Sequence, residues 1–551
     1  MKAEANDDPI TLSSHLLSSL LQEITLTHYF KGKWSLIKTK LTHLHTQLTT
    51  DCTDFFNTNP LSLDLLHSIS QTLTDAVLLA RKCQSPSLTD GKLKTQSDID
   101  STLAKLDRHI NDADVLIKSA FFQDDAVVLT SGSTSKREAV RVESRNLITR
   151  LQIGGTESKN SAMDSVLTLL QEDDKNVMIA VAQGIVPVLV RLLDSSSLQM
   201  KEKAVAAISR VSMVDSSKHA LVAEGLSLLN HLLRVLESGS GFSKEKACVA
   251  LQALSFSREN ARTIGSRGGI SSLLEICQGG TPGSQAFAAG VLKDLAIISE
   301  IRENFIEENA IVVLLGLLAY GTALAQENAI GCLCNLVSDD DNLKILIVKE
   351  GGIDSLKNFW DSGPNIRGLE VAVELLRILA SCVPIADVLV LNGFIPRLVV
   401  VLSCGVLDVR IAAARAVYEL GFSTKTRKEM GECGCIVPLI KLLDGKAVDE
   451  KEAAAKALST LMLYAGNRRV FRKDERGIVS AVQLLDPSIQ NLDKRYPVSI
   501  LASLVHSKKC RTQMIAAGAC VFLQKLVEME VEGAKKLSAS LGRGKIWAFL
   551  P

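Results

Sequence analysis

Two pairs of closely spaced cysteines come nearest, by residue type, to a chemical site. Cys332 with Cys334 and Cys433 with Cys435 each form a CxC pattern, in a chain of 551 residues that holds 12 cysteines. Structural zinc sites usually use CxxC spacing instead, and free cysteines commonly fill small buried spaces. We therefore expect reduced, buried thiols, with a redox switch or a metal site at the Gly-rich turn of Cys433 as the alternative.

The sequence contains none of the common catalytic motifs. The nine histidines are scattered, six of them lie within the first 110 residues, and none stands in an HExxH pattern. The chain also lacks a phosphate loop of the form GxxxxGK followed by Ser or Thr. We therefore expect a protein that is not an enzyme and has no cofactor.

Basic residues gather late in the chain, in two clusters. A formal net charge of +1 gives no global field for capturing nucleic acid or an anionic membrane. Acidic residues interrupt the first cluster, and neither cluster has an aromatic platform for bases. We expect no nucleic-acid partner and keep peripheral membrane association as an alternative. The clusters are Arg468, Arg469, Arg472, Lys473 and Arg476, and then Lys508, Lys509 and Arg511.

These residues lie in a chain that repeats one short sequence motif. The stretch "NGFIPRLVVVL" around Ile395 has equivalents along most of the sequence, at spacings of 40 to 44 residues. A period near 42 residues excludes tetratricopeptide and ankyrin arrays, whose periods are about 34 and 33. The residues equivalent to Ile395 are Val186, Leu226, Ile270, Ile311, Ile353, Ile436, Ile478 and Cys520.

Each repeat has the pattern of three helices. In the repeat around Ile395, Gly393 permits a sharp reversal between two helices. An alanine-rich third helix follows at "VRIAAARAVYELG", with apolar residues at helical spacing. A single repeat cannot bury this surface alone, so stacked repeats are required. The fold class is therefore all-α, with an α-solenoid of the armadillo or HEAT kind.

Residues 1–122 lack this repeat and read as a bundle of amphipathic helices. The expected helices are 9–30, 33–56, 60–83 and 94–122. A polar linker spans 123–139, and its Ser and Thr residues are candidates for phosphorylation. The array spans 140–551, with about nine to ten repeats including incomplete end units.

The sequence gives no signal for a membrane or for secretion. The start "MKAEANDDPITLSS" has no apolar segment behind a basic residue. The longest apolar run, residues 311–320, is shorter than the about 20 residues of a membrane span. We expect a soluble protein of the cytoplasm or also the nucleus, with no integral membrane segment.

Several turns resemble the armadillo family's motif, for example "GIVP" at residues 184–187 and "GCIVP" at 434–438. The segment "LLARKCQSPSLTDGKLKTQSDID" resembles the N-terminal helical domain of plant U-box/armadillo proteins. It is more similar still to the plant armadillo-only relatives described as vacuolar-armadillo-like, as is the closing "EGAKKLSASLGRGKIWAFLP". The resemblance implies an N-terminal bundle followed by a right-handed superhelix, and a protein-binding scaffold in plant signalling.

One part of the U-box architecture is missing. In U-box proteins the ubiquitin-ligase module, about 70 residues long, lies between the bundle and the array. Here residues 123–137 leave no room for it. The resemblance therefore implies a scaffold or adaptor, with a substrate-recognition subunit of a separate ubiquitin ligase as an alternative.

The resemblance also implies where a partner protein would bind. Armadillo proteins bind along a concave groove lined by their third helices, and some use a ladder of Asn residues there. This chain keeps one Asn at those positions, and tryptophans are absent one helical turn earlier, so an import receptor is excluded. The groove residues expected to contact a partner are Arg210, Asp294, Asn335, Glu374, Arg415, Glu419, Lys456 and Ser503.

Overall fold

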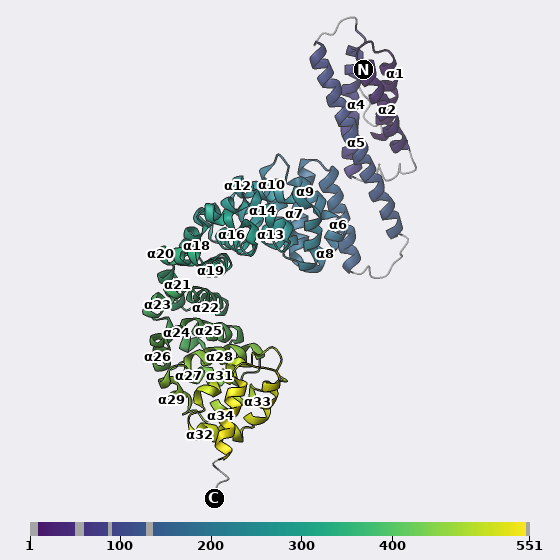
Figure 1. Cartoon of the computed structure of the whole chain (residues 1–551). Helices are drawn as coiled ribbons and strands as arrows, with labels where there is room; N and C mark the ends of the chain where they lie inside the picture. The colour runs from purple at the N-terminus through teal and green to yellow at the C-terminus, as the bar shows by residue number, and fades with distance from the viewer. Residues whose placement is uncertain (1–8, 50–59, 86–90, 128–135, 547–551) are drawn as a thin grey trace. The chain divides into compact units, whose positions relative to one another are not determined.

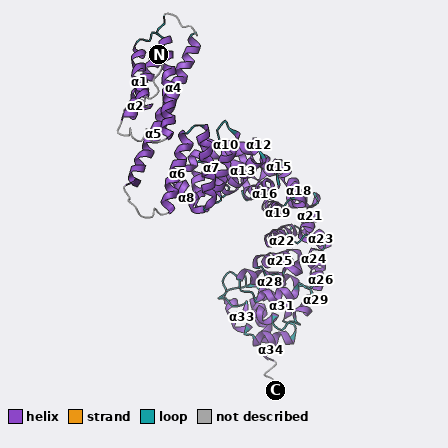
Figure 2. Ribbon diagram, turned by 180° about the vertical axis from the view of Figure 1, so that it is seen from behind, coloured by secondary structure: helices purple, strands orange, loops and turns teal. Residues whose placement is uncertain are grey.

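A computed structural model describes residues 9–49, 60–85, 91–127 and 136–546. These residues form helices, turns and loops without a strand, which confirms the expected all-α fold (Figure 2). The chain divides into two compact units, Met1–Val235 and Leu236–Pro551. The first unit holds the N-terminal bundle and the start of the array, and the second holds the rest of the array (Figure 1).

The N-terminal bundle consists of long helices around a leucine-rich core. Helix α1 packs against α4, and α2 packs against α5. The indole of Trp34 is among the largest fully buried side chains, and leucines from all four helices surround the same core. The helices are α1 (Pro9–Thr25), α2 (Lys31–Thr49), α4 (Pro60–Lys82) and α5 (Lys92–Val127).

The helix ends differ most from the expected ones at the ends of α1 and α5. Helix α1 ends at Thr25 rather than at residue 30, and Phe30 has a φ of 59°, which stops a right-handed helix before α2 begins. Helix α5 continues to Val127, past the expected end at residue 122. The expected end of the second helix at residue 56 lies outside the described residues. The separate linker at 123–139 remains a prediction, because α5 and α6 cover its two ends and residues 128–135 lie outside the described residues.

The array opens with an incomplete repeat of two helices, α6 (Lys136–Ile153) and α7 (Thr156–Glu172). Nine complete repeats follow among the described residues, each with a first, a second and a third helix. The first helices are α8 (Asp174–Ala182), α11 (Lys218–Ala223), α14 (Arg258–Ser266), α17 (Arg302–Glu307), α20 (Asp341–Lys349), α23 (Val383–Leu391), α26 (Thr424–Glu432), α29 (Ala465–Phe471) and α32 (Lys508–Ala516).

The second and third helices complete these repeats. The second helices are α9 (Ile185–Leu192), α12 (Gly225–Ser238), α15 (Gly269–Gly279), α18 (Ala310–Tyr320), α21 (Gly352–Asp361), α24 (Phe394–Val401), α27 (Ile436–Leu443), α30 (Gly477–Gln483) and α33 (Ala519–Glu528). The third helices are α10 (Leu198–Ser212), α13 (Gly241–Leu254), α16 (Pro282–Leu295), α19 (Ala323–Val337), α22 (Ile366–Ala380), α25 (Leu407–Leu420), α28 (Val448–Leu461), α31 (Arg495–Leu504) and α34 (Ala534–Ile546).

In eight of the nine complete repeats described, a left-handed residue makes the turn between the first and second helices, and the turn before α30 is the exception. Gly393 has a φ of 76°, which a glycine adopts without steric cost. Asn309 takes the same place with a φ of 52°, as Asn tolerates this region better than most residues. The turn glycine Gly225 stands one residue before Leu226 rather than two, so Leu226 is 53% exposed and does not match the buried Ile395. Ser227, two residues after Gly225, is exposed as well, so the expected equivalence of Leu226 with Ile395 was wrong, and the buried side chains of α12 begin at Leu228.

The third helices stack directly on one another. Within the second unit, α13, α16, α19, α22, α25, α28 and α31 contact their neighbours in that order. Figure 1 shows these helices in a row along one side of the second unit, with the first and second helices along the other. We call the exposed surface of these seven helices the third-helix face. The stacking is that of an armadillo-type solenoid.

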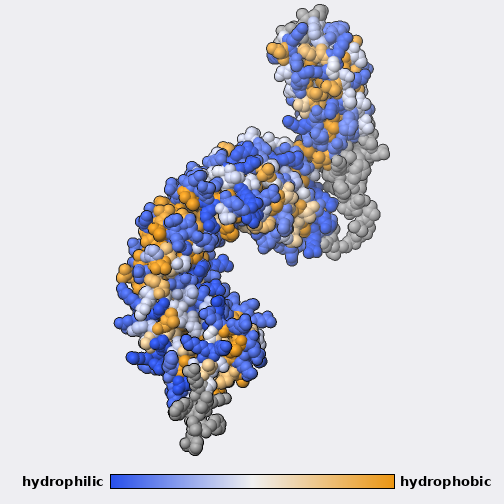
Figure 3. All heavy atoms as spheres, in the orientation of Figure 1, coloured by the Kyte–Doolittle hydropathy of each residue, from blue (hydrophilic) through white to orange (hydrophobic). Residues whose placement is uncertain are grey.

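The side formed by first and second helices carries an apolar surface. Figure 3 shows hydrophobic residues gathered near α18 and α20. Ile306 is 48% exposed and Val312 50% exposed beside a hollow of about 100 Å³. This surface belongs to α17, α18 and α20, and therefore lies apart from the third-helix face.

No single helix in the described ranges is long and apolar enough to cross a membrane. Two bent pairs of first and second helices are long and apolar enough for a membrane span when length and composition alone are considered. They are Asp174–Ala182 with Ile185–Leu192, bent by 88°, and Val383–Leu391 with Phe394–Val401, bent by 85°. Each bend falls at the left-handed glycine that separates the two helices of a repeat.

Candidate partner-binding face

The third-helix face carries seven of the eight groove residues expected from the sequence. Arg210 is on α10 in the first unit, where its Nη2 lies 2.5 Å from Oδ1 of Asp174. This ion pair joins the first and third helices of one repeat. The other seven residues are on α16, α19, α22, α25, α28 and α31 of the second unit.

The residues on α16 and α19 are bound within the protein. The hydroxyl of Ser255 donates to Oδ2 of Asp294 over 3.2 Å, and burial raises the pKa of the Asp294 carboxyl. Nδ2 of Asn335 donates to the backbone oxygen of Lys293 over 2.9 Å. The one Asn of the expected ladder therefore joins two neighbouring third helices through one of its two N–H groups.

Glycines stand one helical turn before Asp294 and Asn335, and the space around them explains why no tryptophan ladder fits there. A Cβ on Gly290 would lie 2.5 Å from the Gln252 side chain, and one on Gly331 would lie 2.8 Å from the Lys293 side chain. The polar side chain of the preceding third helix thus covers each glycine. A larger residue at either place would displace it.

Glu374 is also engaged, with an arginine that the sequence reading did not single out. Nε and Nη2 of Arg377 donate to the two oxygens of Glu374 over 2.9 and 2.7 Å. This bidentate bond is the main cause that raises the pKa of Arg377, and the negative charge of Glu419 adds to it. At the far end, Ser503 donates to the backbone oxygen of Ile500 over 2.6 Å.

Arg415 and Glu419 on α25 differ from these residues. Arg415 is exposed and Glu419 is half-buried, and within the described part of the chain neither makes a hydrogen bond or a close ion pair. They stand four residues apart, so their side chains share one surface of the helix. Their charges are free to meet a partner.

Lys456 on α28 is held by an aromatic ring. Its Nζ lies 4.1 Å from the centroid of Tyr418, which stands on the neighbouring α25. A cation over a tyrosine face is attracted by about 0.5–1 kcal/mol at a partly exposed place. Lys456 is thus positioned by Tyr418, beside the free charges of Arg415 and Glu419.

A carboxylate and a second tyrosine extend this region onto α28 and the start of α31. Burial, with Asp493 and Asp449 nearby, raises the pKa of Glu452, while the positive charges of Arg415 and Lys456 oppose that rise. Burial also raises the pKa of Tyr496, and Asp493 and Tyr418 contribute to this shift. We call Arg415, Tyr418, Glu419, Glu452, Lys456 and Tyr496 the α25–α31 patch.

The sequence reading missed both tyrosines of this patch. The chain has five tyrosines in total, and two of them lie on the third-helix face, on α25 and α31, in repeats separated by the repeat of α28. Tyr418 follows Arg415 by three residues, a helical spacing that places it beside the charged residues already chosen. This tyrosine, three residues after a predicted groove residue, was the signal in the sequence that could have identified Tyr418.

Three of the four cysteines in the two CxC pairs are buried, as expected. Cys332, Cys334 and Cys435 are buried, and burial raises the pKa of Cys435 to about 12. Cys433 is partly exposed, but burial and two nearby glutamates raise its pKa as well. Among the described residues no group of three or more His, Cys, Asp or Glu side chains could hold a metal ion.

Comparisons with known proteins agree with this fold. The family described as "Armadillo/beta-catenin-like repeat" matches residues 173–213, and a "Domain of unknown function (DUF7032)" matches residues 11–121. A crystal structure of an engineered protein is similar over 73% of this chain and 98% of its own, with a TM-score of 0.63 and 22% identity. A designed armadillo repeat protein covers 42% of this chain and 98% of its own, with a TM-score of 0.39 and 20% identity.

The search of curated proteins finds no match. Together with the stacked three-helix repeats, these findings support the fold class, an armadillo-type solenoid that follows an N-terminal helical bundle. The function has to be argued from the residues of the chain.

Proposed function

We propose that the protein is a non-enzymatic scaffold that binds a partner protein on the third-helix face, at the α25–α31 patch. The observation that carries the proposal is the difference between two stretches of that face. Asp294, Asn335 and Glu374 are engaged inside the protein. Arg415 and Glu419, in the next repeat, are not.

The chemistry of the patch suits a partner with charged side chains. Unengaged charges of both signs stand beside two tyrosines, and aromatic and arginine side chains commonly dominate the energy of protein interfaces. Because a single Asn stands at the ladder positions and one of its N–H groups already bonds to Lys293, recognition here depends on side chains more than on holding a peptide backbone. The resemblance to plant armadillo-only proteins suggests a role in signalling, in the cytoplasm or nucleus. The same resemblance is also compatible with a subunit that selects substrates for a separate ubiquitin ligase.

Affinity capture with a charge-reversed variant tests the proposal. The full chain and the variant Arg415→Glu with Lys456→Glu would each be used to capture proteins from an extract of the native cells. Proteins that bind the patch should be retained by the natural chain and lost by the variant. If the variant retains every partner, with its helical content intact by circular dichroism, the working surface is elsewhere.

A second candidate function rests on the side formed by the first helices. Three arginines at equivalent places hold the preceding third helix, since Arg427 donates to the Gly421 oxygen, Arg468 to that of Met462 and Arg511 to that of Val505. Part of each basic cluster is therefore structural. Their neighbours on α26, α29 and α32 and in the turn between α29 and α30 are exposed cations, namely Lys425, Lys428, Arg469, Arg472, Lys473, Arg476, Lys508 and Lys509.

These exposed cations favour an anionic partner, and peripheral recruitment to an anionic membrane is the second proposal. Co-sedimentation of the full chain with vesicles tests it, with and without an anionic lipid. Binding that needs the anionic lipid and falls when Arg469, Lys473 and Lys509 are changed to Gln supports recruitment. Equal binding to neutral vesicles, or none, contradicts it.

A further inference from the structure

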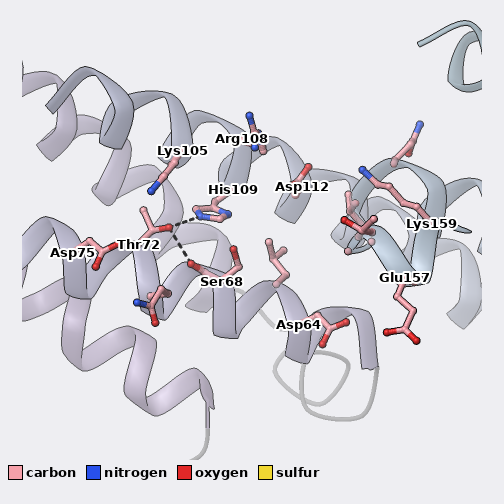
Figure 4. A pocket seen from close by; sticks show the side chains of 18 residues that line it. Asp64, Ser68, Thr72, Asp75, Lys105, Arg108, His109, Asp112, Glu157 and Lys159 are labelled. Carbon is pink, nitrogen blue, oxygen red and sulfur yellow. Dashed lines mark hydrogen bonds between the residues drawn. The ribbon is translucent and has the colours of Figure 1, made fainter. Parts of the chain in front are cut away.

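The first unit contains a polar cavity of about 1090 Å³ beside the N-terminal bundle. Its walls are α4, α5 and the turn between α6 and α7, so we call it the α4–α7 cavity. Figure 4 shows its lining side chains, with those of α4 and α5 facing the start of α7. It plays no part in the third-helix face and needs its own explanation.

Charges of both signs meet at the α7 side of this cavity, where Lys159 and Arg108 stand with Asp112 and with Glu157 in the first turn of α7. Lys159, in the first turns of α7, is half-buried, and burial lowers its pKa. The charges of Arg108 and Arg191 lower that pKa further, and Asp112 is the carboxylate that opposes them. Lys159 and Asp112 are described residues and form no ion pair with each other. An added anion would relieve the repulsion among these cations.

The start of α7 adds free backbone donors at the same place. The helix has 17 residues, and its N-cap is Gly155, which has no side chain to accept the first N–H groups. Such a helix start attracts anions because the N–H groups and the helix dipole both point toward them. A Cβ on Gly155 would meet nothing within 4 Å, so the space in front of the helix is open.

A buried histidine in the same cavity lacks a partner. His109 is 6% exposed, and its Nε2 lies 2.9 Å from the hydroxyl of Thr72. Thr72 donates its one proton to the Ser68 oxygen over 3.0 Å. Nε2 therefore carries the ring proton and donates to Thr72, and Nδ1 is left as an acceptor without a hydrogen bond.

The ring of His109 is uncharged near neutral pH. Burial, with Arg108 and Lys105 nearby, lowers its pKa to about 4. Its Nδ1 therefore fits a hydroxyl or N–H donor and not an anion. The carboxylates of Asp64 and Asp75, on the α4 wall, are further acceptors for hydroxyl groups.

We propose that the α4–α7 cavity binds a small hydroxylated anion of the polyol phosphate type. Its anionic group would lie at the start of α7 between Arg108 and Lys159, and its hydroxyl groups would face His109 and α4. This assignment is independent of the proposed scaffold function.

Titration calorimetry on the full chain tests the proposal with two probes, inorganic phosphate and glycerol 3-phosphate, and with glycerol as an uncharged control. Both anions should bind with saturation, glycerol 3-phosphate more tightly, and glycerol should not bind. Lys159→Met should weaken both anions about tenfold or more, because it removes a charge-assisted hydrogen bond.

Gly155→Asp is the sharpest variant. An aspartate at the N-cap binds the free N–H groups itself and favours the helix, so the protein should stay folded while anion binding is lost. Gly155→Ala is the matched control and should keep binding. Arg469→Gln should also keep it, which excludes phosphate bound on the first-helix side. Absence of saturable binding in the natural chain, or equal binding by Gly155→Asp, would overturn the proposal.

Discussion

Lys456 and Tyr418 are joined across two neighbouring repeats, with Nζ of the lysine 4.1 Å from the centre of the tyrosine ring. The pair connects α28 to α25 on the third-helix face. It fixes the direction of a cation that a sequence comparison would treat as a free surface charge. Arg415, which stands at the equivalent place one repeat earlier, has no such contact within the described residues.

We predict that reversing both cations, Arg415→Glu with Lys456→Glu, weakens partner binding by at least about 2 kcal/mol if the charges are desolvated in the complex. Added salt should weaken the natural complex as well, since exposed charges are screened. Titration calorimetry with a captured partner measures both effects. Unchanged affinity in a natively folded variant would show that these residues form only a solvated surface.

The two single variants should differ in stability. Lys456→Glu loses its contact with Tyr418 and should lower the free energy of unfolding by about 0.5–1 kcal/mol. Arg415→Glu removes no contact and should stay within about 0.5 kcal/mol of the natural chain. Urea unfolding compares them, and equal losses would mean that the contact adds nothing.

The repeat fold could be predicted because its information is local. Glycine turns at a spacing of about 42 residues and alanine-rich third helices define each repeat without knowledge of its neighbours. The state of the groove residues could not be predicted in this way. Asn335 bonds to Lys293, which is 42 residues away, and Arg210 bonds to Asp174, which is 36 residues away. Such pairs depend on how neighbouring helices are placed.

A buried ion pair between repeats offers a stability test. Nη2 of Arg410 on α25 lies 2.7 Å from Oε1 of Glu450 on α28, and the glutamate side chain is only 4% exposed. Arg410→Met should lower the free energy of unfolding by about 3 kcal/mol, because it leaves a buried carboxylate without its cation. Arg415→Met on the same helix is the matched control. A similar small loss in both variants, measured by urea unfolding, would contradict this role of the pair.

No ubiquitin-ligase activity is expected from this polypeptide alone. Residues 123–137 leave no room for an E2-binding module between bundle and array. Purified protein, incubated with E1, ubiquitin and a panel of E2 enzymes, should form no ubiquitin chains. Robust chain formation without another ligase would refute the prediction, and an active U-box protein serves as the positive control.

Limited proteolysis should cut the native chain first between residues 123 and 138. The polar sequence there contains several Ser and Thr residues, and such segments are common sites of nicking. Because α5 extends to Val127 and α6 begins at Lys136, we expect the cut near the middle of this range. Mass spectrometry of the first fragments locates it. A first cut within the array would count against the boundary.

The buried histidine gives a prediction for acid pH. The pKa of His109 is lowered from 6.5 to about 4 in the folded protein. The unfolded chain therefore binds a proton that the folded chain does not, and the stabilising contribution of the neutral ring is lost as pH falls from about 6.5 toward 4. Because one pKa unit corresponds to about 1.4 kcal/mol, the loss in the free energy of unfolding approaches about 3 kcal/mol.

His109→Gln removes the titrating group while keeping a side chain able to bond to Thr72. Urea unfolding of the natural chain and this variant at several pH values separates the histidine from the acidic residues, which titrate in both. The difference in unfolding free energy between the two proteins should change by about 3 kcal/mol between pH 7 and pH 4, in favour of the variant at low pH. A difference that stays constant over this range would show that His109 does not titrate with a lowered pKa, and that its ring is not buried among Thr72, Arg108 and Lys105 as the structure has it.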